Sequence, residues 1–156
     1  MIRFSNVSKK YTRKIQALND VSFHIEQGEF VFLIGPSGAG KTTIMKLLLK
    51  EENPDTGQIF IDGKDVTTLR RRQVAKLRKD IGVVYQDFRL LDSKNVYDNI
   101  SFALDIHGYS KKYKKSKVRS VINQMELRGR EKSLPNELSG GEKQRTSMAR
   151  AIINCR

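Results

Sequence analysis

A glycine-rich loop lies between an apolar run and a predicted helix, and it limits the possible folds more than any other part of the sequence. Residues 30–34 (Phe-Val-Phe-Leu-Ile) form the longest continuous apolar stretch, which predicts a buried strand. In residues 42–50, which follow, the apolar side chains have the spacing of one helix face. Between them stands a full match to the pattern G-x-x-x-x-G-K-[ST], made of Gly35, Pro36, Ser37, Gly38, Ala39, Gly40, Lys41 and Thr42. A strand, such a loop and a helix in this order predict a phosphate-binding loop.

Each residue type in this loop has a chemical reason. Glycines allow backbone N–H groups to turn around phosphate oxygens, and the following helix directs its positive end to the same place. Lys41 can reach the β- and γ-phosphates, and the Thr42 hydroxyl can bind Mg²⁺. We include the adjacent Thr43 among the nucleotide-binding residues. The alternative is a glycine-rich turn that binds no ligand.

Strands and helices alternate along the chain. This alternation predicts an α/β domain with a partly parallel sheet. The expected strands cover residues 2–7, 17–25, 30–34, 58–62 and 81–85, and the expected helices cover residues 42–50, 69–79, 95–107, from 110 onward and from about 140 onward.

A second motif, Leu-Ser-Gly-Gly-Glu, occupies residues 138–142 and opens the last helix. Ser139 and Glu142 have the spacing of a capping box, so the motif could be a helix start and nothing more. Capping does not call for the glycines Gly140 and Gly141, whose backbone N–H groups are open to an anion. Phosphate recognition and simple capping both remain possible from this motif alone.

The two motifs together resemble those of the ABC-type ATPases, and the resemblance runs from residue 1 to about 154. It implies a P-loop NTPase fold with a parallel sheet core, an N-terminal antiparallel β portion and a helical subdomain that carries the second motif. One ABC ATP-binding domain is then expected over 1–156. Residues 1–85 would form the β portion and loop core, and 86–156 the helical portion.

The resemblance also implies roles for single residues, with ATP and Mg²⁺ as cofactors. Tyr11 matches an aromatic that stacks on adenine, although a tyrosine at a strand end can be an ordinary one. Gln86 matches a glutamine that reaches the metal and the attacking water, so Lys41 and Gln86 are the expected catalytic residues. ABC domains work as head-to-tail dimers, in which Ser139, Gly140, Gly141 and Glu142 of one copy face the ATP of the other.

Three runs narrow the resemblance to the cell-division branch of the family: residues 29–40, 47–52 and 85–91. That branch implies an integral membrane partner, a peripheral place on the cytoplasmic face of the cell membrane, and control of cell-wall hydrolysis. Residues 87–91 lie where such ATPases contact the membrane partner. The alternative is an ATPase of the lipoprotein-release or macrolide-export type.

The family continues beyond the point that corresponds to Asn154, with an apolar strand ending in Asp-Glu and then a histidine. We therefore expect an incomplete ABC domain without its C-terminal core strands, in which hydrolysis by the chain alone is doubtful. The other hypothesis is a chain that binds ATP and never hydrolyses it.

Charge and composition bear on partners. The 30 basic and 17 acidic residues give a formal net charge of +13, and residues 106–156 hold 13 of the basic and 4 of the acidic ones. A basic tract over 111–119 could contact nucleic acid or anionic lipid. It has one aromatic residue and no stacking platform, so we interpret it as a solvated helix face and expect no nucleic-acid partner. The single cysteine, Cys155, excludes an internal disulfide.

Overall fold

A computed structural model describes residues 1–12, 14–105 and 107–154, and Cys155 lies outside these ranges. The chain divides into two compact units, Met1–Leu77 and Arg78–Arg156. Each unit is described by itself.

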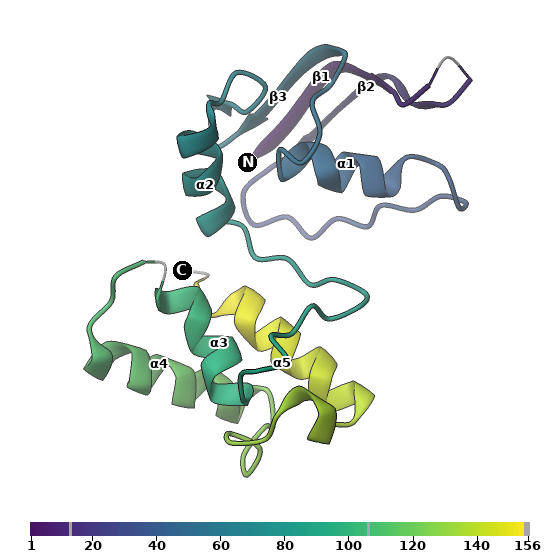
Figure 1. The fold of residues 1–156 in the computed structure, drawn as a ribbon. Coiled ribbons are helices and arrows are strands. Elements are labelled where there is room, and N and C mark those ends of the chain that lie inside the picture. Colours follow the sequence, from purple (N-terminus) through teal and green to yellow (C-terminus); the bar gives the residue numbers. More distant parts are fainter. Residues whose placement is uncertain (13, 106, 155–156) are drawn as a thin grey trace. The chain divides into compact units, whose positions relative to one another are not determined.

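The first unit is built on an antiparallel sheet, coloured purple to teal in Figure 1. Its strands are β1 (Ile2–Lys10), β2 (Gln16–Ile25), β3 (Thr56–Ile61) and β4 (Lys64–Asp65), in the order β2-β1-β3-β4. Ile2 pairs with Ile25 on one side and with Ile61 on the other, so β1 is an interior strand of the sheet. The predicted strands over 2–7, 17–25 and 58–62 are confirmed.

Helix α1 (Lys41–Leu48) packs on this sheet and closes the first core. The helix contributes Ile44 and Leu47, and the core comprises Phe4, Val7, Leu18, Ile44, Leu47, Ile59 and Val66. Helix α2 (Arg71–Lys79) is short, strongly basic and without a buried residue. The core residues of α1 thus hold this helix against the sheet.

The second unit is helical. Helix α3 (Val96–Asp105) packs against both α4 (Lys111–Gln124) and α5 (Gly140–Ile152), and the 3₁₀ helix η1 (Pro135–Glu137) precedes α5 (Figure 1). The Ser110 hydroxyl accepts a hydrogen bond from the Tyr113 N–H and begins α4, as its sequence predicts. The core comprises Val96, Ile100, Leu104, Val118, Val121, Ile122, Leu127, Leu138, Ala149 and Ile153.

Two predicted strands are wrong. Residues 30–34 and 81–85 are irregular and pair with no strand among the described residues. The apolar run is exposed to water, with Phe30 at 84% and Ile34 at 89%. Apolarity favours burial in a sheet, but a strand also needs a neighbour that accepts and donates its backbone hydrogen bonds.

In the described ranges, every helix is too short or too polar to cross a bilayer.

Candidate functional site

The phosphate loop is shaped by glycines with left-handed backbone angles. Gly38 and Gly40 have φ of +82° and +86°. A Cβ at Gly40 would lie 2.5 Å from the Ala17 carbonyl oxygen and 2.8 Å from Leu18 Cδ2. Any side chain there would displace β2, because real Cβ atoms do not approach backbone so closely. Gly40 therefore holds the loop against the sheet.

Lys41 ties the loop together from the first residue of α1. Its Nζ donates to the carbonyl oxygens of Gly35 and Pro36, each at 2.6 Å. An ammonium has three donors, so this geometry leaves one for a phosphate oxygen. The cation thus lies at the mouth of the loop.

The N-terminus of α1 has the electrostatics of an anion site. Its N-cap is Gly40, which has no side chain to accept from the first-turn N–H groups, and the first turn holds no acidic residue. The helix dipole adds positive potential at this end. The loop, the lysine and the uncapped helix together fit a polyphosphate.

The two threonines after Lys41 have different surroundings. Thr42 is exposed and free to meet a metal ion, whereas Thr43 is 6% exposed. The Thr43 hydroxyl donates to the Tyr11 hydroxyl at 3.4 Å. This contact places Tyr11, which is 42% exposed, beside the first turn of α1.

Besides Lys41, two further cations lie near this site, next to the Tyr11 ring. Lys9 Nζ and Lys46 Nζ lie 5.5 Å and 5.9 Å from the ring centroid. An exposed aromatic ring next to a phosphate loop can stack on a base, and cations near its face strengthen attraction to a polyphosphate ligand. The stacking role of Tyr11 stays a prediction that this placement supports.

Gln86 lies on a turn in the second unit, with its side chain exposed. The turn is closed by the Phe88 N–H, which donates to the Tyr85 carbonyl oxygen at 3.1 Å. Phe88 and Arg89 have φ of +58° and +44°. Two consecutive non-glycine residues in this region need support from their surroundings.

Helix α5 supplies that support. Ser147 Oγ and Arg150 Nη2 both donate to the Phe88 carbonyl oxygen, at 3.1 Å and 3.0 Å. The Arg150 guanidinium is held partly away from water, and this burial lowers the pKa of Arg150. Helix α5, which begins within the second motif, therefore holds the loop that contains Gln86, residues 85–91. This contact could not be predicted from the sequence, because 59 and 62 residues separate Ser147 and Arg150 from Phe88.

A buried amide anchors the far end of the same loop. Asn99 is fully buried on α3, accepts from the Leu91 N–H at 2.8 Å and donates to the Leu91 carbonyl oxygen at 3.1 Å. This residue could have been found, because an asparagine between Val96 and Ile100 interrupts an apolar helix stripe.

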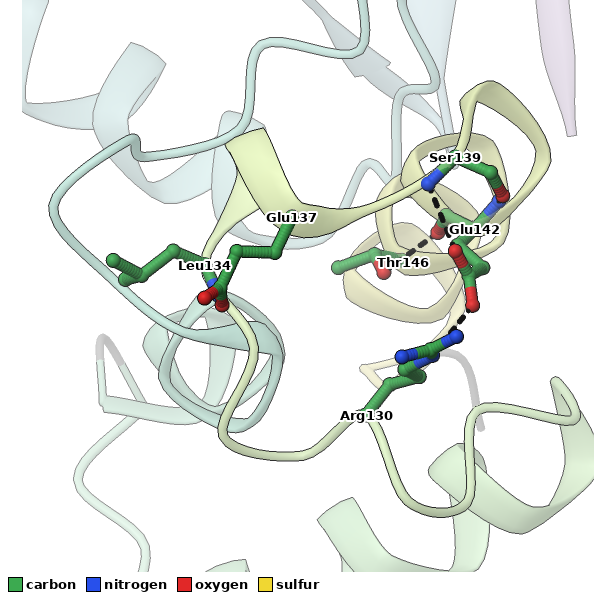
Figure 2. A network of polar contacts seen from close by, with 6 residues as sticks. All are labelled: Arg130, Leu134, Glu137, Ser139, Glu142 and Thr146. Carbon is green, nitrogen blue, oxygen red and sulfur yellow. Dashed lines mark hydrogen bonds and ion pairs between the residues drawn. The ribbon is translucent and has the colours of Figure 1, made fainter.

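The second motif forms a complete capping box at the start of α5 (Figure 2). The Ser139 hydroxyl accepts from the Glu142 N–H at 3.3 Å, and the Glu142 carboxylate accepts from the Ser139 N–H at 2.8 Å. Arg130 Nε donates to the same carboxylate at 2.7 Å, and the Thr146 hydroxyl donates to the Glu142 carbonyl oxygen at 2.8 Å. The sequence-based interpretation missed Arg130 and Thr146.

Packing does not explain the two glycines of this motif. A Cβ at Gly140 would meet nothing within 4 Å, and one at Gly141 would only reach Arg145 Nη1 at 3.5 Å. Neither has a positive φ. Small residues with free approach on a helix N-terminus are suited to an external anion.

Glu142 makes the cap pH-dependent. Hydrogen bonds from the Ser139 backbone and side chain, and then the Arg130 guanidinium, lower the pKa of Glu142 to about 2. A lowered pKa gives stability that is complete above the ordinary value of about 4.3 and is lost as the pH falls towards 2.

Glu142→Gln is therefore expected to flatten the loss of stability between about pH 4.3 and 2. Glutamine keeps the capping geometry and removes the charge. Urea midpoints measured by circular dichroism at several pH values test this, with Glu126→Gln as an exposed control. If the variant loses stability as steeply as the wild type at acid pH, Glu142 is not responsible for that loss.

The described residues hold no cluster of three or more histidine, cysteine or acidic side chains that could bind a metal alone. Mg²⁺ commonly keeps several waters and uses one or two protein groups together with substrate phosphates. The exposed Thr42 hydroxyl fits such a shared site. Gln86, the other expected metal ligand, belongs to the second unit and stays a prediction.

The family model described as ABC transporter matches residues 18–156, a range that includes both motifs. The chain belongs to the ABC transporter family. This ABC domain is 43% identical over 154 residues to the Cell division ATP-binding protein FtsE of Bacillus subtilis (strain 168), covering 99% of the chain and 68% of the relative. It is 48% identical over 155 residues to FtsE of Mycobacterium tuberculosis (strain ATCC 25618 / H37Rv), covering 99% and 67%.

Solved ABC cassettes share the fold. The dimeric structure of MJ0796, a bacterial ABC transporter cassette, is 34% identical with a TM-score of 0.89, covering 99% of this ABC domain and 70% of that chain. A post-hydrolysis dimer of MJ0796 bound to ADP and Pi is 33% identical with a TM-score of 0.88, covering 99% and 70%. The expected fold class and ATPase family are confirmed, and the roles of single residues stay predictions.

Proposed function

We propose that this ABC domain binds MgATP and acts as the ATP-binding subunit of a cell-division complex with an FtsX-like integral membrane partner. The observation that carries the first part is the phosphate loop, where Lys41 crosses the loop mouth at the uncapped start of α1. The cell-division role is supported by the FtsE relatives.

Each residue has a defined part in ATP binding. The loop N–H groups and Lys41 hold the β- and γ-phosphates, and the Thr42 hydroxyl holds Mg²⁺. Tyr11 stacks on adenine, and the buried Thr43 hydroxyl keeps the Tyr11 ring in place. Gln86 supplies a further ligand to the metal and orients the attacking water. When bound, Mg²⁺ would neutralise charge that develops on the phosphates.

Two copies bind ATP between them in this proposal. Ser139, Gly140 and Gly141 of one copy face the γ-phosphate held by residues 35–42 of the other. The open approach to Gly140 and the dimeric state of the MJ0796 cassettes support this arrangement. Dimer closure on ATP and opening after hydrolysis would turn the chemical step into motion.

A hollow on the second unit is the proposed binding site for the membrane partner. Its volume is about 410 Å³, and it combines apolar side chains with both charges. It is lined by Asp87, Phe88, Arg89, Leu90, Asp92, Pro135, Asn136 and Lys143. The hollow thus joins the loop of Gln86 to the start of α5. A partner docked there, on the cytoplasmic face of the membrane, would respond to both and could regulate cell-wall hydrolysis.

Co-purification tests the choice of partner. The chain is co-expressed with an FtsX-like membrane protein or with the membrane subunit of a lipoprotein-release or macrolide-export transporter, and captured in detergent. We expect capture of the FtsX-like protein, reduced at least tenfold by Leu90→Asp, because the substitution replaces an apolar contact with a carboxylate that must lose its water when the membrane protein docks. Lys94→Asp, which lies outside the hollow, is the control. Preferential capture of a transporter subunit would favour the alternative function.

A further inference from the structure

Helix α4 presents an unusually basic surface that the proposed function does not use. The helix carries six cations and no acidic residue. Lys114 pairs with Asp105. Lys112, Lys115 and Arg119 follow one another at i, i+3 and i+7, so they lie along one face. All three are exposed, and none has an acidic partner among the described residues.

A hollow of about 390 Å³ adjoins this basic face. It is lined by Tyr97, Lys115, Arg119, Gly129, Glu131 and Lys132. Three cations against one carboxylate make it a place for an anion, and a tyrosine hydroxyl can add a hydrogen bond to a phosphate oxygen. The hollow is large enough for a phosphorylated headgroup.

We propose that Lys112, Lys115, Arg119 and Lys132 bind the anionic surface of a lipid bilayer, with a lipid phosphate in the hollow. From Lys112 to Arg119 the cations span roughly 10 Å along α4, and Lys112 lies outside the hollow, which suits a charged plane better than one soluble anion. Val118, Val121 and Ile122 are buried in the core, so α4 has no apolar face to insert and the contact is electrostatic.

The aromatic residues near α4 agree with a bilayer rather than a nucleic acid. Tyr109 and Tyr113 are exposed at the N-terminal end of the helix, with ring centroids 4.7 Å apart. His107 stacks on Tyr109 as well. Rings that contact one another do not offer the row of separate faces on which bases stack. Tyrosine is, however, common at the membrane–water interface.

Vesicle flotation of the full chain tests the proposal. Vesicles of phosphatidylcholine alone are compared with vesicles that include phosphatidylglycerol, at low and high salt. We expect binding only to the anionic vesicles and release by salt. Each cation near an anionic surface changes binding about fivefold, so the triple variant Lys112→Gln, Lys115→Gln, Arg119→Gln should bind at least tenfold more weakly.

A matched variant distinguishes an effect of the α4 cations from an effect of the chain's net charge. Arg71→Gln, Arg72→Gln, Lys76→Gln removes the same three charges from α2, and we expect it to bind vesicles like the wild type. Equal losses in both variants, or no binding by the wild type, would overturn the proposal. So would tight binding of an oligonucleotide that depends on the same α4 cations while vesicles are ignored. ATP binding should be unchanged in both variants, which keeps this test independent of the proposed function.

Discussion

Lys41→Ala is expected to weaken ATP binding about 100-fold, because it removes a charge-assisted hydrogen bond to the phosphates. The same substitution releases the carbonyl oxygens of Gly35 and Pro36, which Lys41 holds at 2.6 Å. The loop then loses both its cation and the two hydrogen bonds that close it. Titration with a fluorescent ATP analogue in the presence of Mg²⁺ measures the change.

Two controls make this result specific. Lys76→Ala removes an exposed cation from α2 in the same unit, and we expect unchanged ATP affinity. Circular dichroism of Lys41→Ala shows whether α1 and the sheet persist. An intact fold with wild-type affinity would mean that the loop does not bind the phosphates.

Gly140→Asp is expected to abolish ATP-dependent dimerisation and leave ATP binding by each copy unchanged. A Cβ at Gly140 meets nothing within 4 Å, so the unit accommodates the side chain. An acidic residue in the first turn of α5 also favours the helix through the dipole. The new carboxylate would meet the γ-phosphate of the opposite copy, and like charges repel strongly in a closed interface.

Gly140→Ala provides the matched comparison, because it adds the carbon without the charge. We expect sedimentation with MgATP to show dimers for the wild type, fewer dimers for Gly140→Ala and none for Gly140→Asp. Stable dimers of Gly140→Asp would place the second motif away from the phosphates, and its residues would then be a helix cap alone.

The parts that the sequence predicts correctly are those set by nearby residues. The loop and the start of α1 follow from the spacing of Gly35, Gly40 and Lys41, and the capping box follows from Ser139 and Glu142 three residues apart. Such features depend on backbone angles and hydrogen bonds within a few residues. They could therefore be placed before any tertiary structure was known.

The parts that it misses depend on distant partners. Residues 30–34 are apolar enough for a strand and yet form none, because backbone pairing needs a second segment. Ser147 and Arg150 reach the Phe88 carbonyl oxygen only once α5 has packed on α3. Arg130 donates a hydrogen bond to Glu142 from 12 residues away, and no motif in the sequence indicates this contact. One exception is Asn99, whose polarity in an apolar stripe is visible in the sequence.

A titration of the labelled chain with MgATP, followed by amide chemical shifts, shows directly whether the phosphate loop binds ATP. Binding at the phosphate loop predicts the largest shifts at Gly38, Gly40, Lys41 and Thr43, with smaller ones near Tyr11. Shifts concentrated at Lys115, Arg119 and Lys132 would instead assign the nucleotide to the basic hollow beside α4. That result, or an unchanged spectrum at saturating MgATP, would contradict ATP binding by the loop.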